Sequence, residues 1–485
     1  MQALQLLLNS VNSSVWLTLA GLVYLGITLS TAIHVLLNQQ REGSAIAWLG
    51  IIFLSPGLGI VVYWLLGINR IKRRARREFL GAEKIGIPLK APPHEGHHLN
   101  PAAQYLMTTG RAIHADVYVD GNQLQILDSG DQAYPAMLAA IDSATDSVFL
   151  SSYIFDYDDI GRQFIEALGS AHQRGVVVRV MIDGVGIGYS FSWIKTDRAL
   201  RARGISTARF LPTLSRRGTR FINLRNHRKI LSIDGKIAFV GGINIRDANL
   251  LNTKTSTKHK NRDLHFQLTG PVIKQVNSVF LDDWLFACGE TLAIPPTDDV
   301  GSGSTICRVL PDGPDENYLK LQTAITAAIN AASKTISIVT PYFLPGSIVL
   351  HALKIAVLRG VKVQVIVPKK SNIRFIDWAF RAELKNLLAN GIEVYFSPDP
   401  FDHSKLFLVD DYWCLIGSSN WDSRSLRLNF EVNVECYDQE LNAALTKTIV
   451  EKRSQSNFAI GLHSINQSLP ARLRNSFCRL FSPYL

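Results

Sequence analysis

Apolar positions divide the chain into two long uninterrupted runs near the start and a longer part with short periodic segments. Val15–Leu37 and Ser44–Gly67 contain no Asp, Glu, Lys or Arg. Each run is long enough to cross the ~30 Å hydrocarbon core of a bilayer, and aromatic residues lie near the ends, as they do at membrane interfaces. We therefore predict a hairpin of two transmembrane helices, with Pro56 tolerated inside the second.

Beyond these runs, two stretches share one order of elements. Residues 147–184 and 335–368 each predict an apolar strand, an amphipathic helix and a valine-rich strand. Gly175 and Gly360 stand just before the second strand of each stretch, where glycine commonly follows a helix end. In the first helix the apolar positions recur at helical spacing, at Phe164, Leu168 and Ala171. The pattern predicts two homologous α/β units and excludes a short-period solenoid.

A short motif follows each stretch. It consists of a histidine, a lysine two residues later and an aspartate five residues beyond the lysine. The six residues are His227, Lys229 and Asp234 in the first copy and His403, Lys405 and Asp410 in the second. The aspartates fall at expected hairpin turns, of which Asp234-Gly235 is the clearer signal. One copy alone could be an ordinary solvent-facing hairpin, but a second copy with the same spacing favours a functional motif.

These residue types favour an anionic substrate. Residues two apart on an extended strand point to the same face, so each copy presents an imidazole beside an ammonium group. Two such pairs brought together by a pseudo-twofold would form one positive pocket that fits a phosphodiester. Lys229 and Lys405 would neutralise the non-bridging oxygens. Asn244 and Asn420, at the small-residue corner after each copy, would add neutral donors.

Two histidines in one pocket predict nucleophilic and acid–base catalysis. One imidazole would attack phosphorus to form a phospho-histidine, and the other would protonate the departing alkoxide. Carboxylates that hold the far ring nitrogens would fix the tautomers, and Asp263 and Glu431 are the candidates. Asp234 and Asp410 complete the catalytic motif, but they lie at turns, so we assign them a structural role within it.

The charge of the chain indicates its surroundings. The formal net charge is +11, and a cluster of bases directly follows the second apolar run. This cluster consists of Arg70, Lys72, Arg73, Arg74, Arg76 and Arg77. The link between the two runs carries only Arg41 as a base, so the positive-inside rule predicts that residue 70 onward is cytoplasmic. A basic cluster beside a membrane span favours anionic lipid headgroups over nucleic acid as its partner.

Neither a metal nor another cofactor is expected. The five cysteines contain no Cys-x-x-Cys pair and are odd in number, which is typical of reduced, mostly buried thiols in a cytosolic domain. His94, His97 and His98 lie in a Pro- and Gly-containing stretch without cysteine or a carboxylate pattern. Residues 78–110 are therefore predicted to be linker, and no set of metal ligands accompanies the two motif copies.

The duplicated motif resembles that of the phospholipase D superfamily, and more narrowly the chain is similar to bacterial cardiolipin synthases with two N-terminal membrane spans. The narrower resemblance rests on the second apolar run and on the strings "YIFDYDDIG", "TPYFLP", "NLRNHRKI", "FLDDW", "SSNWDSRSLRLNFEV" and "RLFSPYL". It implies an α/β fold of two phospholipase D-type domains, each a sheet flanked by helices, related by a pseudo-twofold. The expected boundaries are 1–70 for the transmembrane hairpin, 71–110 for the basic juxtamembrane segment and linker, 111–300 for the first domain and 301–485 for the second.

The resemblance also implies a reaction. His227 would be the nucleophile and His403 the general acid, with Asp263 and Glu431 each serving the histidine of the opposite half. The implied enzyme transfers a phosphatidyl group from one phosphatidylglycerol to another and releases cardiolipin and glycerol. It would be a multi-pass protein of the bacterial cytoplasmic (inner) membrane, with its catalytic domains on the cytoplasmic side and anionic lipids as partners.

Three other functions stay open. A hydrolytic phospholipase D would use water in the same pocket and release phosphatidate. A phosphodiesterase acting on nucleic acid would suit the net charge, but the two apolar runs and the lack of a clear basic stripe with interleaved aromatics argue against it. A catalytically dead membrane scaffold is disfavoured because both motif copies are intact. The oligomeric state stays open as well.

Overall fold

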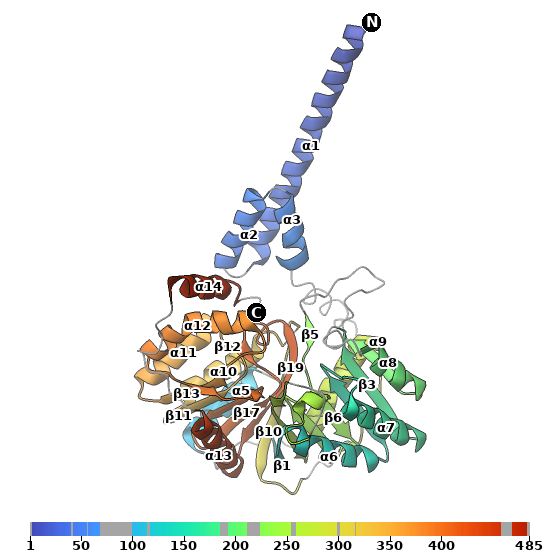
Figure 1. The fold of residues 1–485 in the computed structure, drawn as a ribbon, viewed down its shortest axis with the longest axis vertical. Coiled ribbons are helices and arrows are strands. Elements are labelled where there is room, and N and C mark those ends of the chain that lie inside the picture. Colours follow the sequence, from blue (N-terminus) through green and yellow to red (C-terminus); the bar gives the residue numbers. More distant parts are fainter. Residues whose placement is uncertain are drawn as a thin grey trace. The chain divides into compact units, whose positions relative to one another are not determined.

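The chain forms two compact units, Met1–Arg77 and Glu78–Leu485 (Figure 1). The computed structural model describes residues 2–39, 42–55, 57–67, 99–113, 117–184, 193–210, 224–253, 259–297, 301–315, 317–456 and 468–482. The predicted linker histidines from His94 to His98 and the basic cluster from Arg70 to Arg77 lie outside these residues.

The first unit contains a helix that is long and apolar enough to cross a membrane. Helix α1 (Gln2–Asn38) has 37 residues, and its segment Val15–Asn38 has a mean hydropathy of 1.8. At 1.5 Å per residue, this 24-residue segment is about 36 Å long, which exceeds the ~30 Å hydrocarbon core. The first apolar run is therefore confirmed as one continuous helix.

The second apolar run, Ser44–Gly67, is not one continuous helix. It forms in order α2 (Glu42–Leu54), α3 (Leu58–Val62) and the π-helical turn η1 (Tyr63–Gly67). Gly57 has a left-handed φ of 79°, and a Cβ on Gly59 would overlap the carbonyl oxygen of Ile51. The chain thus turns closely beside the end of α2, and the prediction of a second uninterrupted span is not confirmed.

The second unit is built on a mixed β-sheet in which one order of strands occurs twice. From one edge inward, the first half supplies β4 (Ser206–Phe210), β3 (Val177–Asp183), β2 (Ser147–Ser152), β6 (Ile230–Ile233), β7 (Ile237–Gly241), β9 (Leu264–Thr269) and β1 (Val119–Asp128). From the other edge, the second half supplies β14 (Glu393–Ser397), β13 (Lys362–Pro368), β11 (Thr335–Val339), β16 (Leu406–Val409), β17 (Trp413–Gly417), β19 (Asn429–Tyr437) and β10 (Thr305–Asp312). In each half the three outer strands are parallel and the others antiparallel. The antiparallel pair β1–β10 joins the halves, so the predicted repeat of two α/β units is confirmed.

Helices cover both faces of this sheet (Figure 1). They are α6 (Ser129–Asp142), α7 (Asp159–Gln173), α8 (Trp193–Ala202) and α9 (Ile273–Cys288) in the first half, and α10 (Lys320–Ala331), α11 (Ser347–Leu358), α12 (Arg374–Ala389) and α13 (Gln439–Gln455) in the second. Neighbouring strand residues face different cores, as the pleat requires. Ile230 and Leu406 belong to a core that both halves share under α9 and α13, whereas Leu231 and Phe407 belong to the separate cores of each half. The shared core makes the two halves one body.

Residues 101–110 were expected to be linker, but they belong to a helix. Helix α5 (Pro101–Ile113) buries Ala103, Leu106 and Met107, which recur at helical spacing, and packs on α10 of the second half. A Cβ at Gly110 would overlap the hydroxyl of Tyr118, so glycine permits this close packing. The linker prediction is wrong for this stretch because three apolar positions in one turn suffice to bury a helix face.

Both motif hairpins form as predicted. β6 and β7 pair around Asp234 and Gly235, whose φ angles of 52° and 66° suit a type I′ turn. β16 and β17 pair in the same way around Asp410, which has φ 51°. Gly175 and Gly360 follow α7 and α11 with φ angles of 91° and 87°, as expected for glycine past a helix end.

Candidate functional site

A short strand precedes each motif histidine and pairs with a strand of the opposite half of the second unit. β5 (Arg225–Asn226) directly precedes His227 and pairs in parallel with β19 of the second half. β15 (Phe401–Asp402) directly precedes His403 and pairs with β8 (Asn261–Arg262) of the first half. The pairing continues one residue further, because the His227 N–H donates to a carbonyl of β19 (2.8 Å) and the His403 N–H donates to a carbonyl of β8 (2.7 Å). Each histidine is thereby held beside the residue that follows the accepting carbonyl, which is residue 431 for His227 and residue 263 for His403.

That following residue is a carboxylate in both cases. The Nδ1 of His227 lies 3.1 and 3.0 Å from the two carboxylate oxygens of Glu431. The Nδ1 of His403 lies 2.7 Å from Oδ2 of Asp263. An ionised carboxylate only accepts hydrogen bonds, so it holds the proton on Nδ1 and leaves a lone pair on Nε2. These are the two pairings across the halves that the family resemblance implied.

Both motif lysines lie beside the histidines and are buried. Lys229 donates from Nζ to the carbonyl oxygen of His227 (2.7 Å), and Lys405 makes the matching bond to the carbonyl of His403. The second half differs in one respect. Lys405 Nζ also lies 2.8 Å from Nδ1 of His403 and 3.6 Å from Oδ2 of Asp263. The second histidine therefore has an ammonium group and a carboxylate at the same ring nitrogen.

Burial and mutual repulsion set the charge state of this group. Burial lowers the pKa of His227 and, together with Lys405, lowers the pKa of His403 to about 4. Burial also lowers the pKa of Lys229 to about 7 and lowers that of Lys405. Crowded cations in a dry pocket are costly, and a bound anion relieves that cost. The electrostatics thus favour an anionic ligand.

The carboxylates of Asp263 and Glu431 stay ionised because cations and hydrogen-bond donors surround them. Burial by itself raises the pKa of Asp263 and of Glu431, but their cationic and hydrogen-bonding neighbours outweigh it, and both pKa values are lowered. Lys405 is the strongest of these neighbours for Asp263, and His227 is the strongest for Glu431.

The small-residue corners after β7 and β17 hold the two carboxylates in different ways. Ser418 Oγ donates to Oε2 of Glu431 (2.5 Å), and Asn429 Nδ2 donates to Oε1 (3.2 Å). The matching corner of the first half has Gly242, where a Cβ would overlap both carboxylate oxygens of Asp263. The roles of these residues were not predicted. The alignment of Gly242 with Ser418 in the two motif copies was the available signal.

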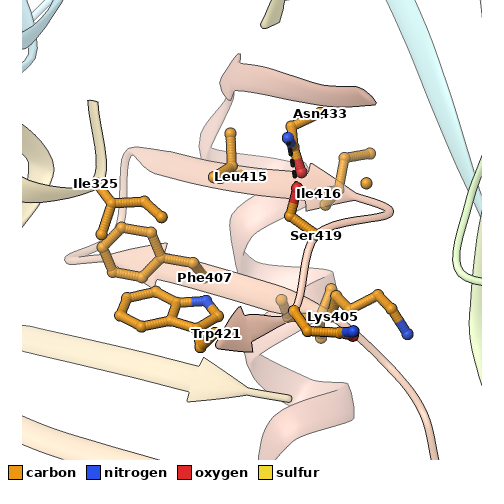
Figure 2. Close-up of a pocket in the computed structure, with 11 residues that line it drawn as sticks. Ile325, Lys405, Phe407, Leu415, Ile416, Ser419, Trp421 and Asn433 are labelled. Carbon is orange, nitrogen blue, oxygen red and sulfur yellow. Dashed lines mark hydrogen bonds between the residues drawn. The ribbon is translucent and has the colours of Figure 1, made fainter. Parts of the chain in front are cut away.

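The two predicted asparagines do not occupy equivalent environments. Asn244 has a structural bond, because its Oδ1 accepts from the backbone N–H of Ile154 (3.0 Å). The Oδ1 of Asn420 is buried and has no hydrogen-bond partner among the described residues. Asn420 lines a recess beside Lys405 that is shown in Figure 2, where Asn433 Nδ2 donates to Ser419 Oγ (2.9 Å).

Asp234 and Asp410, the third residues of each motif copy, do not face the histidines. The carboxylate of Asp234 accepts the backbone N–H groups of residues 145–147 at 2.8–2.9 Å. That of Asp410 accepts the N–H groups of residues 333–335 at 2.7–2.9 Å. Each aspartate fastens its hairpin turn to the start of β2 or β11, so the geometry supports a structural role within the motif.

A buried ion pair involves the residue next to each motif histidine in the sequence. Arg228 forms an ion pair with Asp283 of α9, and its Nε donates to the carbonyl of Glu431 (2.9 Å). In the second half the charges are exchanged, since Lys452 of α13 donates to Asp402 (2.7 Å). Removing one member of such a pair leaves an unpaired buried charge, so these pairs fix the backbone that carries the histidines.

Within the described ranges, no group of three or more His, Cys, Asp or Glu side chains is arranged to hold a metal ion. All five cysteines are free, and four are buried, as expected: Cys307, Cys414, Cys436 and Cys478.

Comparison with known proteins agrees with this architecture. The family described as "Cardiolipin synthase, PLD-like domain" matches residues 137–284 and 325–452, more than half of the chain, and "Phospholipase_D-nuclease N-terminal" matches residues 26–67. The chain is 32% identical to the major cardiolipin synthase ClsA of Bacillus subtilis (strain 168), over 94% of this chain and 96% of that protein. It is 30% identical to a cardiolipin synthase of Geobacillus kaustophilus (strain HTA426), over 94% of this chain and 91% of that protein.

The fold also occurs in a solved structure of lower sequence identity. The phosphatidylserine synthase of Haemophilus influenzae Rd KW20 matches with a TM-score of 0.63 and 16% identity, over 80% of this chain and 100% of that one. The similarity in sequence to the cardiolipin synthases extends over nearly the whole chain, and the ranges matched by the family contain both motif copies. The chain therefore belongs to the cardiolipin synthase family of phospholipase D-like proteins.

Proposed function

We propose that this protein is a cardiolipin synthase, which transfers a phosphatidyl group from one phosphatidylglycerol to the glycerol hydroxyl of another. The observation that carries the proposal is the joined site. Two histidines, each bonded to a carboxylate of the opposite half, lie with two buried lysines in a chain similar to cardiolipin synthases over 94% of its length. The products are cardiolipin and free glycerol.

The first step forms a covalent intermediate. The Nε2 lone pair of His227 attacks phosphorus, the bond from phosphorus to the glycerol oxygen breaks, and the imidazolium of His403 gives its proton to that oxygen. Lys229 and Lys405 hold the non-bridging oxygens while charge develops on them. The enzyme then carries a phosphatidyl group on His227, and glycerol leaves.

The second step reverses the roles. His403, now neutral, takes the proton of the glycerol hydroxyl of a second phosphatidylglycerol. The oxygen attacks phosphorus, and the bond from phosphorus to Nε2 of His227 breaks. One phosphodiester replaces another, so the reaction is close to isoenergetic, and we propose that neither a metal nor a nucleotide takes part.

The surroundings of the two rings support this division of roles. Among the described residues, only Glu431 is within hydrogen-bond distance of Nδ1 of His227, which favours a nucleophilic lone pair on Nε2. Nδ1 of His403 meets both Asp263 and Lys405. The low pKa of His403 leaves it neutral in the empty pocket, and the negative phosphodiester favours its protonation when substrate binds.

The N-terminal part supports a membrane location. The apolar helix α1 is long enough to span a bilayer, and we propose that the catalytic unit lies on the cytoplasmic side of the bacterial inner membrane because the bases from Arg70 to Arg77 follow the second apolar run. A multi-pass hairpin over residues 1–70, a juxtamembrane segment and linker from residue 71 to the start of α5, and domains over 111–300 and 301–485 related by a pseudo-twofold complete the proposal. The repeated strand order supports the last point.

Lipid analysis of cells tests the function. Membranes from cells that make the protein should gain cardiolipin at the expense of phosphatidylglycerol, and cells that make the His227→Ala variant should not. A hydrolytic phospholipase D would release phosphatidate instead. Cleavage of nucleic acid without any change in lipids would support the phosphodiesterase alternative and refute the proposal.

The purified enzyme gives a second test. Because the exchange is close to isoenergetic, added glycerol should convert cardiolipin back to phosphatidylglycerol. If glycerol produced no back-reaction and only phosphatidate appeared, the synthase proposal would be wrong.

A further inference from the structure

The C-terminal helix α14 (Leu469–Arg479) turns its large apolar side chains away from the protein. It packs on α12, yet the residues that it buries are Asn475 and Cys478. The exposed side chains form one stripe, which we call the outer apolar face: Leu469 (65% exposed), Leu473 (63%), Phe477 (58%) and Leu480 (72%). A helix that only stabilised the fold would bury this stripe.

Specific contacts keep α14 in this orientation. The guanidinium of Arg474 lies 4.4 Å from the centre of the Trp378 ring, and Arg479 forms an ion pair with Glu383 (2.8 Å). Phe481, just past the helix, packs edge-on against Phe375 with ring centres 5.7 Å apart. All three partners belong to α12. The outward direction of the apolar stripe is therefore part of the folded structure.

The charge of this end of the chain complements an anionic surface. After Glu451 the chain contains no Asp or Glu. The bases in the same stretch are Lys452, Arg453, Arg472, Arg474 and Arg479. The three arginines of α14 flank the outer apolar face, with Arg479 also paired to Glu383 of α12. A helix that itself combines an apolar stripe with bases and carries no acids is typical of helices that lie in the headgroup region of anionic bilayers.

We propose that α14 is an interfacial membrane helix, which inserts its outer apolar face at the acyl boundary of an anionic bilayer and thereby seats the catalytic unit on the lipid surface. This contact is separate from α1, which belongs to the other unit. It rests on the exposure and charge of α14 and does not require the reaction proposed above.

A chain of contacts links α14 to the candidate site. Phe481 contacts Phe375 near the start of α12. Asn372, just before α12, accepts a hydrogen bond from the Tyr342 hydroxyl (2.6 Å), and the Tyr342 ring lies 6.3 Å from that of His403. In Figure 1, α14 and β5, which precedes His227, lie at the same upper end of the second unit. A bilayer held by α14 would therefore lie at the end of the unit that carries β5.

Spin labelling of the full chain in vesicles tests the contact. The label is attached to cysteine in a Phe477→Cys variant that also carries Cys288→Ser, because Cys288 is the exposed native thiol. The matched control is Val450→Cys on α13, an apolar residue that is also exposed (45%). In vesicles of equal parts phosphatidylglycerol and phosphatidylcholine, the label at 477 should become accessible to oxygen and shielded from a water-soluble nickel chelate, whereas the label at 450 should stay exposed to the chelate.

Two outcomes would overturn the proposal. One is full exposure of the label at 477 to the chelate in the anionic vesicles. The other is equal shielding of the label at 477 in vesicles of phosphatidylcholine alone, which would show that the arginines of α14 do not direct the helix to anionic headgroups. A label in a Leu473→Cys variant repeats the measurement in case the first substitution disturbs the helix. Shielding without any cardiolipin formation would refute the proposed function and leave this inference standing.

A functional variant adds an independent readout. Replacing Leu473 and Phe477 by glutamine should lower turnover of phosphatidylglycerol in vesicles about tenfold, because the helix loses two apolar side chains that would insert into the bilayer. Turnover of a short-chain phosphatidylglycerol below its micellar concentration should not change, because that substrate needs no bilayer. Val450→Gln is the control and should leave both rates unchanged. An equal loss on both substrates in the double variant would contradict the proposal.

Discussion

Replacing Glu431 by glutamine tests the pairing of the halves most directly. The side chain is fully buried, and glutamine has nearly the same shape. Three donors converge on its two oxygens: His227 Nδ1, Ser418 Oγ and Asn429 Nδ2. A glutamine offers one acceptor oxygen and one NH2 group, so at least one donor then faces another donor. If the NH2 group faces His227, the ring proton moves to Nε2 and the nucleophilic lone pair is lost.

The size of the effect follows from the geometry. In the proposed intermediate, with Nε2 bonded to phosphorus, His227 would be a cation whose Nδ1 lies 3.0 Å from the carboxylate. Two unit charges at this separation interact by about 5 kcal/mol at an effective dielectric constant of ~20. A retained neutral hydrogen bond returns about 1 kcal/mol. The remaining loss of about 4 kcal/mol corresponds to a reaction slower by roughly 10³-fold.

The assay separates the two steps of the reaction. With a phosphodiester whose leaving group needs no proton, attack by His227 limits the rate, so Glu431→Gln should slow formation of the phosphorylated enzyme. The matched control is Asp263→Asn, which alters the other histidine. It should spare attack on this activated substrate and slow only the reaction with phosphatidylglycerol.

Several results would refute this reasoning. A rate for Glu431→Gln within fivefold of the wild type would show that the carboxylate does not stabilise the intermediate. Isolation of the phosphorylated residue as His403 in the wild type would reverse the roles of the two histidines. Thermal unfolding of the variant should stay within a few degrees of the wild type, so that a loss of rate is not a loss of fold.

Three further predictions concern the supports of the site. Gly242→Ala should push Asp263 off the imidazole that it holds and lower kcat by roughly 100-fold, because the new Cβ would overlap both carboxylate oxygens; an unchanged kcat would contradict the geometry. The ammonium of Lys229, with its pKa lowered to about 7 by burial, is lost as the pH rises through that value, so KM for phosphatidylglycerol should increase above pH 7. Lys229→Arg should remove that increase, which KM measured in mixed micelles would check. Asp410→Ala removes the acceptor of three backbone N–H groups, so it should lower the free energy of unfolding by about 3 kcal/mol in a denaturant titration. The control is Asp411→Ala at the exposed neighbouring residue, which should lower it by less than about 1 kcal/mol.

Local patterns were sufficient to predict much of the catalytic unit. The repeat of strand, helix and strand follows from apolar spacing, because burial of one helix face or one strand face depends on residues close in sequence. The hairpin at Asp234-Gly235 follows from the left-handed angles that these two residues tolerate. Asp263 and Glu431 were candidates from the residues themselves, the family resemblance implied that each serves the histidine of the opposite half, and their bonds to the histidines agree with both.

Local patterns were insufficient where packing decides. The second apolar run has the length of a membrane span, yet it divides at Gly57, because the close approach of Gly59 to Ile51 depends on a turn of the backbone. Helix α5 lies in a stretch whose Pro and Gly content is typical of linkers, but it finds a buried place on the second half.

The sequence by itself determined the two homologous halves and the motif residues, and it predicted an anionic substrate, because these inferences depend on spacing and residue type. Only the tertiary structure decided how the halves combine. Glu431 meets His227 across 204 residues, and Asp263 meets His403 across 140, through short parallel pairings that local spacing does not encode. The same holds for α14, whose amphipathic pattern is compatible with a buried apolar face. Its packing through Asn475 and Cys478 turns that face outward, because Arg474 on the Trp378 ring and Arg479 with Glu383 hold the opposite face against α12.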